Sequence, residues 1–80
     1  MKILVRNLSV ETTQAVLLAL FSEYGDVQYC TVVMDKVTGK SKGFGFVEMP
    51  RAGEAKVAIK GLNARVVDGN KIRVKKAEKS

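Results

Sequence analysis

The chain has 80 residues, 46% of them hydrophobic, which is enough for one small domain with a buried core. It contains no histidine and one cysteine, so zinc clusters, Cys–His nucleophiles, Ser–His–Asp triads and disulfide frameworks are excluded. Residues 1–35 hold two basic and four acidic side chains, whereas residues 36–80 hold twelve and four. This concentrated positive charge favours a polyanionic partner, such as nucleic acid or an acidic membrane surface.

Neither a membrane span nor a secretory signal is expected. The longest apolar run, residues 15–21, is far shorter than the roughly 20 residues that a membrane helix needs. Arg6 interrupts the apolar residues near the N-terminus, which argues against a signal peptide. A single thiol, Cys30, is then typical of a reduced compartment, and its position predicts a small core residue. We therefore expect a cytoplasmic protein without membrane contact.

The first third of the chain predicts a strand followed by a helix. Residues 2–6 alternate between polar and apolar side chains, as a half-buried strand does. A helix is expected to begin at Gln14, because the hydroxyl of Thr12 or Thr13 can accept hydrogen bonds from amides of its first turn. Gly25 is expected at the C′ position, where this helix stops. Its buried stripe is predicted to comprise Leu17, Leu20, Phe21 and Tyr24.

The remaining residues predict three more strands and a second helix. Strands are expected at 27–35 and 42–49, separated by a polar hairpin loop. Pro50 would end the second of these strands and can open a helix. A turn at 68–69 then precedes a last strand at 71–75. The buried stripe of the second helix is predicted to comprise Ala55, Ala58, Ile59 and Leu62.

The predicted order of elements is β-α-β-β-α-β. With short connections and right-handed crossovers, this order indicates an α+β fold of the ferredoxin-like, split βαβ type. Such a fold is a four-stranded antiparallel sheet with both helices on one face. We expect one domain over residues 1–77 and a short basic tail at 78–80, with fraying from Lys76 onward.

Strand alternation predicts which side chains the uncovered face of the sheet displays. Phe44 and Phe46 are expected there, because they share their parity with Lys42 and Glu48, which would be costly to bury unpaired. The opposite parity holds Gly43 and Gly45, which are expected to let a covering helix approach closely. The inward positions are predicted to be Ile3, Val5, Cys30, Val32, Met34, Val47, Met49, Ile72 and Val74.

An exposed pair of rings among cations has a physical use. An unstacked base can lie on such a ring, which contributes roughly 1–3 kcal/mol per base. Lysines and arginines around the rings can contact the phosphates that accompany the bases. Because stacking on a side chain needs accessible base faces, the expected ligand is a single-stranded nucleic acid.

Two segments resemble the sequence motifs of the RNA-recognition motif family, and the resemblance covers essentially the whole chain. Residues 42–49, KGFGFVEM, match the family's RNP octamer at seven of eight positions, and residues 3–8, ILVRNL, are similar to its hexamer. The short layout is similar to that of small bacterial proteins with a single such domain. The resemblance implies a non-catalytic, single-stranded RNA-binding module that uses no cofactor or metal.

The chain departs from the family pattern at two positions. Leu4 stands where the hexamer usually has an aromatic residue, so one of three stacking rings is missing. Met49 ends the octamer in place of an aromatic residue, but its inward parity makes it a core residue. The residues expected to contact RNA are Lys2, Leu4, Arg6, Tyr29, Thr31, Val33, Lys40, Lys42, Phe44, Phe46, Glu48, Arg73 and Lys75.

Several alternatives stay open. Tyr29 is either a ring that compensates for Leu4 or a half-buried tyrosine at the sheet edge, and Glu48 could accept a hydrogen bond from a base amine. Lys36, Lys40 and Lys42 form either a phosphate clamp, as the resemblance implies, or a solvated loop. Single-stranded DNA remains a possible ligand, because the contacts that select the 2′-hydroxyl group cannot be identified from sequence.

Two other classes of function compete with RNA binding. The first helix is apolar beyond its buried stripe, which suggests either an extended core or a surface for protein contact or self-association. The residues concerned are Ala15, Val16, Leu18 and Ala19. Acylphosphatases share the split βαβ architecture, but this chain has no glycine-rich loop after the first strand and no evident acid–base pair, so we expect no enzyme.

Overall fold

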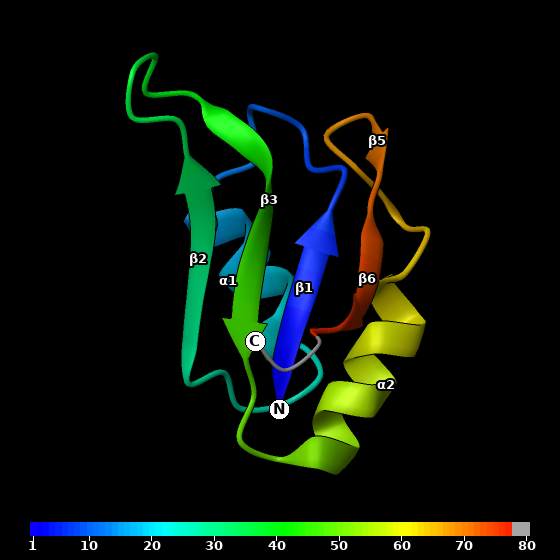
Figure 1. Ribbon diagram of the computed structural model, residues 1–80. Coiled ribbons are helices and arrows are strands. Elements are labelled where there is room, and N and C mark those ends of the chain that lie inside the picture. The colour runs from blue at the N-terminus through cyan, green and yellow to red at the C-terminus, as the bar shows by residue number, and fades with distance from the viewer. Residues whose placement is uncertain (78–80) are drawn as a thin grey trace.

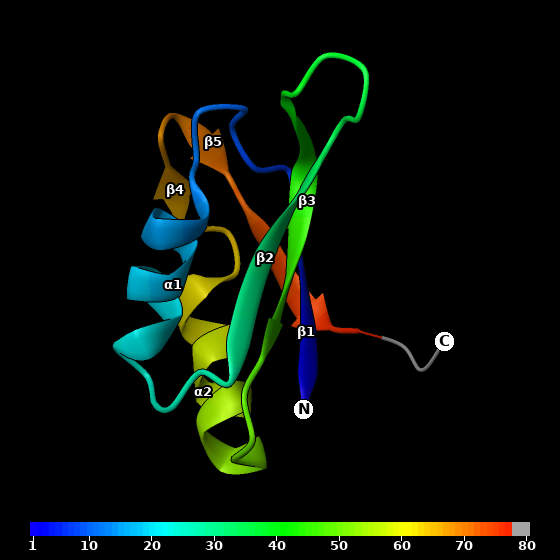
Figure 2. The same cartoon turned by 90° about the vertical axis from the view of Figure 1, so that its left-hand side faces the viewer.

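Residues 1–77 are described by the computed structural model, in which both helices cover the same face of one sheet (Figures 1 and 2). The sheet has four antiparallel strands in the order β2-β3-β1-β6. The elements are β1 (Lys2–Arg6), α1 (Gln14–Ser22), β2 (Tyr29–Met34), β3 (Ser41–Glu48), α2 (Ala52–Leu62), β4 (Val66–Val67), β5 (Asn70–Lys71) and β6 (Arg73–Lys76). The predicted ferredoxin-like fold is confirmed, with β4 and β5 added as a separate hairpin.

The core lies between the sheet and the two helices. Alternating residues of the strands point toward the helices and are buried, as their parity predicted. The core residues of the four sheet strands are Ile3, Val5, Cys30, Val32, Val47 and Val74, joined by Leu8, Met49, Ile72 and, from β4, Val67. The helix residues in the core are Leu17, Phe21, Ala55, Ala58 and Leu62, while Leu20, Tyr24 and Ile59 are partly buried against them.

Two threonines fix the start of α1 in different ways. Thr13 is the N-cap, and its hydroxyl accepts a hydrogen bond from the Val16 amide at 3.2 Å. Thr12 is buried, and its hydroxyl donates to Asp68 Oδ2 at 2.7 Å. The second contact ties the start of α1 to the β4–β5 hairpin, which lies more than fifty residues further along the chain.

The predicted helix stop at Gly25 is wrong. α1 ends at Ser22, and its C-cap Glu23 is in the right-handed helical region, with φ −67°. Gly25 instead makes room for α2, because a Cβ atom there would collide with the side chain of Glu54. The Glu54 carboxylate accepts a hydrogen bond from the Asp26 amide at 3.1 Å, so the loop after α1 is fastened to the second helix.

The glycines of β3 also have a different role from the predicted one. A Cβ atom on Gly45 would collide with the carbonyl oxygen of Thr31 and lie 3.2 Å from Val32 Cα. A Cβ atom on Gly43, which has φ +83°, would lie 3.3 Å from the carbonyl oxygen of Leu8. Both glycines therefore make room for neighbouring backbone of β2 and the β1–α1 loop, and not for a helix.

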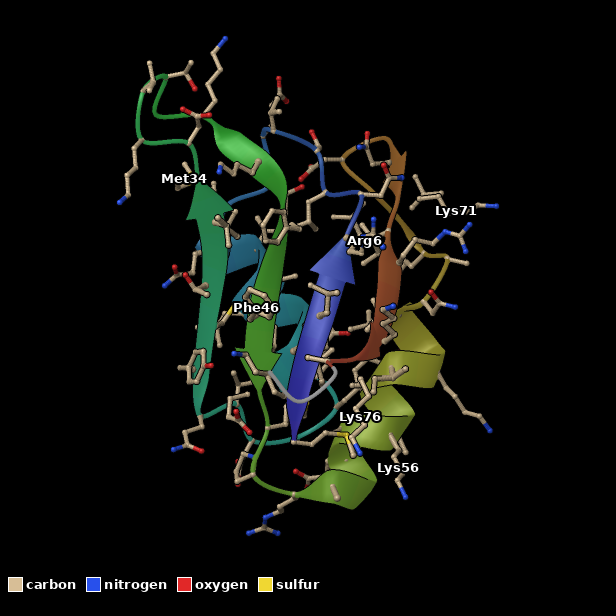
Figure 3. The ribbon with its side chains drawn as sticks, viewed as in Figure 1. Arg6, Met34, Phe46, Lys56, Lys71 and Lys76 are labelled. Atoms are coloured by element: carbon tan, nitrogen blue, oxygen red, sulfur yellow. The ribbon has the colours of Figure 1, made fainter. Side chains whose placement is uncertain are left out.

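Met34 was predicted to point into the core, but 52% of it is exposed. Its pair with Ser41 follows a register shift after the pair of Val32 with Gly45. Between these pairs β2 contributes one residue and β3 contributes three, so regular alternation fails here. Figure 2 shows that the β2–β3 loop projects beyond the helices. Met34 lies at this end of β2, where the helices no longer cover the sheet (Figure 3).

The predicted boundaries of the later elements need smaller corrections. β2 and β3 are each shifted or shortened by one or two residues at their ends, and α2 begins two residues after Pro50, with Arg51 as its N-cap. The predicted last strand at 71–75 is divided. Asp68 and Gly69, with φ of +51° and +85°, form the turn between β4 and β5, and the sheet strand starts at Arg73.

The C-terminal end of the described chain is more ordered than predicted. Lys76 was expected to fray, but it pairs with Ile3 in the β6–β1 ladder. The Ala77 amide then donates to the Lys2 carbonyl oxygen at 2.9 Å and prolongs the pairing by one residue. The predicted tail at 78–80 lies outside the described residues.

Candidate nucleic-acid interface

The face of the sheet opposite the helices, here called the open face, carries the outward side chains of four strands. Strand register arranges them in three rows across the sheet. From β6 toward β2, the rows are Arg73, Arg6 and Phe44; Lys75, Leu4, Phe46 and Thr31; and Lys2, Glu48 and Tyr29. In Figure 3 Arg6 and Phe46 are labelled on this face, with the helices behind the sheet. The predicted parity of these residues is therefore correct.

Phe44 and Phe46 lie on the open face and are half-buried, outside the core. Their ring centroids are 6.1 Å apart and their planes meet at 89°, an edge-to-face contact that aromatic pairs favour. Lys2 Nζ lies 4.7 Å from the Phe46 ring centroid, within reach of a cation–π contact. The two rings are thus held by each other and by a cation, while part of their surface stays open to solvent.

A hollow of about 530 Å³ lies over these rings. The side chains that line it combine apolar surface with positive charge. They are Lys2, Leu4, Arg6, Phe44, Phe46, Lys75 and Ala77. Leu4 occupies the position between Phe46 and Lys75 in the middle row and contributes an aliphatic surface without a ring. The arrangement can accept flat apolar groups on its floor and anionic groups at its rim.

Glu48 is the one acidic side chain in the rows of the open face, and a neighbouring cation compensates its charge. Its Oε2 atom lies 3.0 Å from the amino nitrogen of Met1. That amino group also donates to the carbonyl oxygen of Met49 at 2.6 Å. Glu48 therefore opposes an anionic ligand less than a free carboxylate would, and it can still accept a hydrogen bond.

The cations of the open face form no ion pairs with protein groups in residues 1–77. The two ion pairs found in that part of the chain join Met1 to Glu48 and Arg51 to Asp26. Lys2, Arg6, Lys42, Arg73 and Lys75 are all exposed. Their charges are therefore available to a ligand.

Tyr29 is more accessible than a half-buried edge residue, with 45% of it exposed. It pairs with Glu48 and is the diagonal neighbour of Phe46, so the two residues are about 7–8 Å apart. Thr31, directly opposite Phe46, and Val33 are half-buried. Strand β2 itself therefore adds one accessible ring and no cation to the open face.

The β2–β3 loop has a well-defined backbone and exposed lysines. The Asp35 carboxylate accepts hydrogen bonds from the amides of Val37 and Thr38 at 2.8 and 3.0 Å, and these bonds hold the pKa of Asp35 below its usual value. The Asp35 amide donates to the Lys40 carbonyl oxygen at 2.7 Å, which closes the loop. Lys36, Lys40 and Lys42 are exposed on and beside it. Their ammonium groups are therefore accessible to a ligand.

Other candidate sites of the sequence are also placed by the structure. Ala15, Val16, Leu18 and Ala19 are exposed on α1, so the core does not extend over them. Cys30 is buried, and burial raises the pKa of its thiol to about 11, which makes it unreactive at neutral pH. In residues 1–77 no cluster of His, Cys, Asp or Glu could hold a metal ion, and no helix is long and apolar enough to cross a membrane.

Sequence reasoning missed two residues that border the open face. Ala77 lines the hollow, and the continued alternation of Arg73, Lys75 and Ala77 is the signal that could have placed it there. Asn63 lies beside Arg73 and Lys75 at the outer edge of β6, in a second cavity. No local pattern indicates that position, because it depends on how α2 packs against β6.

Comparison with known proteins places these features in a family. The model of the RNA recognition motif family matches residues 3–73. The putative RNA-binding protein RbpA of Nostoc sp. is 44% identical over 78 residues, which are 98% of this chain and 76% of that protein. Across four curated relatives, the aligned part of this chain corresponds to 16% to 76% of the relative's own length.

Solved structures agree with this match. The crystal structure of the RNA-binding protein PG1 has a TM-score of 0.94 and 39% identity, and the match covers 100% of this chain and 96% of that one. A Sex-lethal protein–RNA complex also has a TM-score of 0.94, with 30% identity over 99% of this chain and 47% of that one. The family match spans most of the chain and carries both sequence motifs. This chain belongs to the RNA recognition motif family, and the names of these relatives indicate a binding module.

Proposed function

We propose that the protein binds single-stranded RNA on the open face of its sheet. The observation that carries this proposal is the pair of accessible rings, Phe44 and Phe46, in a hollow whose rim is positively charged. Bases would stack on the rings, and the rim cations would contact the phosphates. Stacking requires unpaired bases, because the faces of bases in a duplex are covered by their neighbours.

The contacts divide by chemistry. Phe44, Phe46 and Leu4 offer apolar surface to bases. Tyr29, the diagonal neighbour of Phe46 on β2, offers a further ring. Thr31, Val33 and Glu48 border the bases on the β2 side, where Glu48 can accept a hydrogen bond from a base amine. The proposed phosphate contacts are Lys2, Arg6, Lys40, Lys42, Arg73 and Lys75.

Three findings support RNA as the ligand. The relative RbpA is named as a putative RNA-binding protein, and a solved neighbour with a TM-score of 0.94 is a protein–RNA complex. The open face carries unpaired cations in the described chain, as a polyanion requires. We also propose that the protein is not catalytic and acts in the cytoplasm, which fits its single buried thiol.

The double substitution of Phe44→Ala and Phe46→Ala tests the proposal. With two stacked bases lost, the affinity for an unstructured eight-nucleotide RNA should fall about 30-fold or more in a fluorescence anisotropy titration. Circular dichroism should show an unchanged fold. Val57→Ala, a substitution of an exposed residue on α2, serves as the control and should bind as the wild type does.

Two further measurements, a salt titration and a competition titration, complete this test. If about four phosphates are engaged, the slope of log affinity against log salt should be near −3. A competition titration with single-stranded DNA of the same sequence measures the preference for RNA. A folded double variant that binds RNA as tightly as the wild type would overturn the proposal.

A further inference from the structure

The two edges of the sheet differ in how they are protected. β6 forms one edge, and three of its four residues are Lys or Arg. The Val74 amide of this strand donates to Asn63 Oδ1 at 3.0 Å, and residues 63–65 are hydrogen-bonded beside the segment that leads into β6. Charged side chains and a covering loop keep an edge strand from pairing with another chain. The β6 edge is therefore closed.

β2 forms the other edge, and it has none of these protections. Its six residues, YCTVVM, include no charged side chain and no proline. Figure 1 shows β2 at the margin of the sheet, and in the part of the chain that the structure describes no strand pairs with its outer side. Residues 7–35 contain no Lys or Arg, so this edge does not suit an RNA backbone. An uncharged edge strand of this kind is a template for a further strand.

The hydrogen bonds of the sheet show which backbone groups of β3 face β2. In an antiparallel ladder, residues bonded to one neighbouring strand alternate with residues whose N–H and C=O groups point the other way. Met1 and Met49 exchange two hydrogen bonds at the end of the β1–β3 ladder, so the odd-numbered residues of β3 bond to β1. The even-numbered residues then face β2. In agreement, the Gln28 amide donates to the Glu48 carbonyl oxygen at 2.7 Å.

The same alternation shows which residues of β2 face the open edge. Tyr29 and Thr31 stand opposite even-numbered residues of β3, so their N–H and C=O groups bond to that strand. Cys30 and Val32 lie between and after them, so their N–H and C=O groups point out of the sheet. These two residues offer donors and acceptors at the spacing that an added strand requires.

The helix beneath this edge is uncharged as well. α1 packs under β2, where the Cys30 thiol donates to the Gln14 carbonyl oxygen at 3.8 Å (Figure 1). No residue of Gln14–Ser22 is charged, and Val16 and Leu18 are exposed although they are large and apolar. The open edge and the exposed part of α1 therefore adjoin each other.

A second copy of this chain satisfies both features at once. A strand from an unrelated peptide would satisfy the edge alone and leave α1 uncovered. When β2 pairs antiparallel with β2 of a second copy about a twofold axis, the two α1 helices meet beneath the joined strands. A twofold interface places a surface against itself, so a charge on it would meet a like charge. The absence of charge from both β2 and α1 is what such pairing requires.

From these observations we infer that the protein forms a symmetric dimer through β2, in which two four-stranded sheets become one sheet of eight strands. The outward groups of Cys30 and Val32 bond to β2 of the second copy, and the second α1 covers Val16 and Leu18. Both open faces then lie on the same side of the joined sheet. If the proposed function holds, an RNA with two binding segments can occupy both copies at once, which raises its affinity without a new kind of contact.

Hydrogen exchange at two protein concentrations tests the dimer directly. Amide exchange is measured by NMR at about 30 µM and about 1 mM, because mass action favours the dimer at the higher concentration. The monomer fraction of a largely dimeric protein falls with the square root of concentration, so protection of the Cys30 and Val32 amides should rise about three- to sixfold. The Tyr29 and Thr31 amides are bonded to β3 in either state and should change less. Sedimentation velocity should show a dimer and no larger species.

Substitutions of exposed residues locate the interface. Met34→Lys places a cation at the end of β2, and Leu18→Lys places one on α1. Each should weaken dimerisation about tenfold or more, because lysine on an edge strand or on its self-paired flank opposes pairing. Val37→Lys in the β2–β3 loop and Val57→Lys on α2 introduce the same side chain elsewhere and should keep the wild-type dimer. All four residues are exposed, so the fold should be retained.

Three results would overturn the inference. They are a monomer at both concentrations, a dimer in which the Cys30 and Val32 amides gain no protection, and wild-type dimerisation in both Met34→Lys and Leu18→Lys. A monomer in which these amides are protected only by an added peptide of alternating Thr and Val would also overturn it, because the edge then takes a foreign strand. RNA binding that needs Phe44 and Phe46 would persist in each case, and the proposed function would stand.

Discussion

The two faces of the sheet are built from alternating residues of the same strands, yet they have opposite chemistry. On β1, Ile3 and Val5 are fully buried beneath the helices, while Leu4 and Arg6 face outward. On β3, Val47 is fully buried and Phe46 lies on the open face. One face closes the core, and the other keeps large apolar side chains at the surface, among cations.

The contrast between the two faces separates the apolar residues that stabilise the fold from those available for binding. A side chain in a close-packed core stabilises the fold through the contacts around all of its surface. An apolar ring left partly open to water gains less from folding, and a contiguous surface patch of such residues marks an interaction site. Phe21 and Phe46 are the same residue type in these two situations.

The largest expected effect separates these two phenylalanines. Phe21→Ala should lower the free energy of unfolding by about 3–5 kcal/mol, because it empties a fully buried position of the core. Phe46→Ala should lower it by less, about 1–3 kcal/mol, because it loses the contact with Phe44 and the burial of a ring that is only partly covered. Urea denaturation measures both values. Similar losses of stability in the two variants would show that the open face is part of the core.

Strand alternation predicted the composition of both faces, with Met34 as the exception. The parity of Phe44 and Phe46 with charged neighbours placed the rings correctly, because a buried unpaired charge is costly wherever the strand lies. The predictions that failed depended on the partner of a residue. Met34 follows a register shift, and Gly45 makes room for the backbone of β2, neither of which a strand reveals by itself.

The ends of the helices and strands also depend on residues that are distant in the sequence. Lys76 is ordered because Ile3, more than seventy residues earlier, provides its partner. Gly25 is needed because Glu54 of the second helix packs there. The second cavity, at the outer edge of β6, could not be predicted either, since it requires the end of α2 to meet β6 through Asn63 and Val74. Local pattern predicts the type and direction of an element, whereas tertiary contacts decide its ends and its neighbours.

A smaller effect is expected from restoring a ring to the open face. Leu4→Phe should tighten binding to a short single-stranded RNA by about 5- to 150-fold, the equivalent of roughly 1–3 kcal/mol for one stacked base. Val57→Phe, which adds a ring on the exposed surface of α2, is the matched control and should leave the affinity unchanged. Anisotropy titrations compare the three proteins. A Leu4→Phe variant with wild-type affinity would mean that no base lies over the middle of β1.

The most direct measurement of the central claim is a map of amide chemical shifts during titration with a short single-stranded RNA. We predict changes concentrated in β1, β3 and β6, including Leu4, Phe44 and Phe46, and extending to Tyr29. The exposed residues Val16 and Leu18 of α1 should not respond. Changes confined to α1, with none on the open face, would contradict the account.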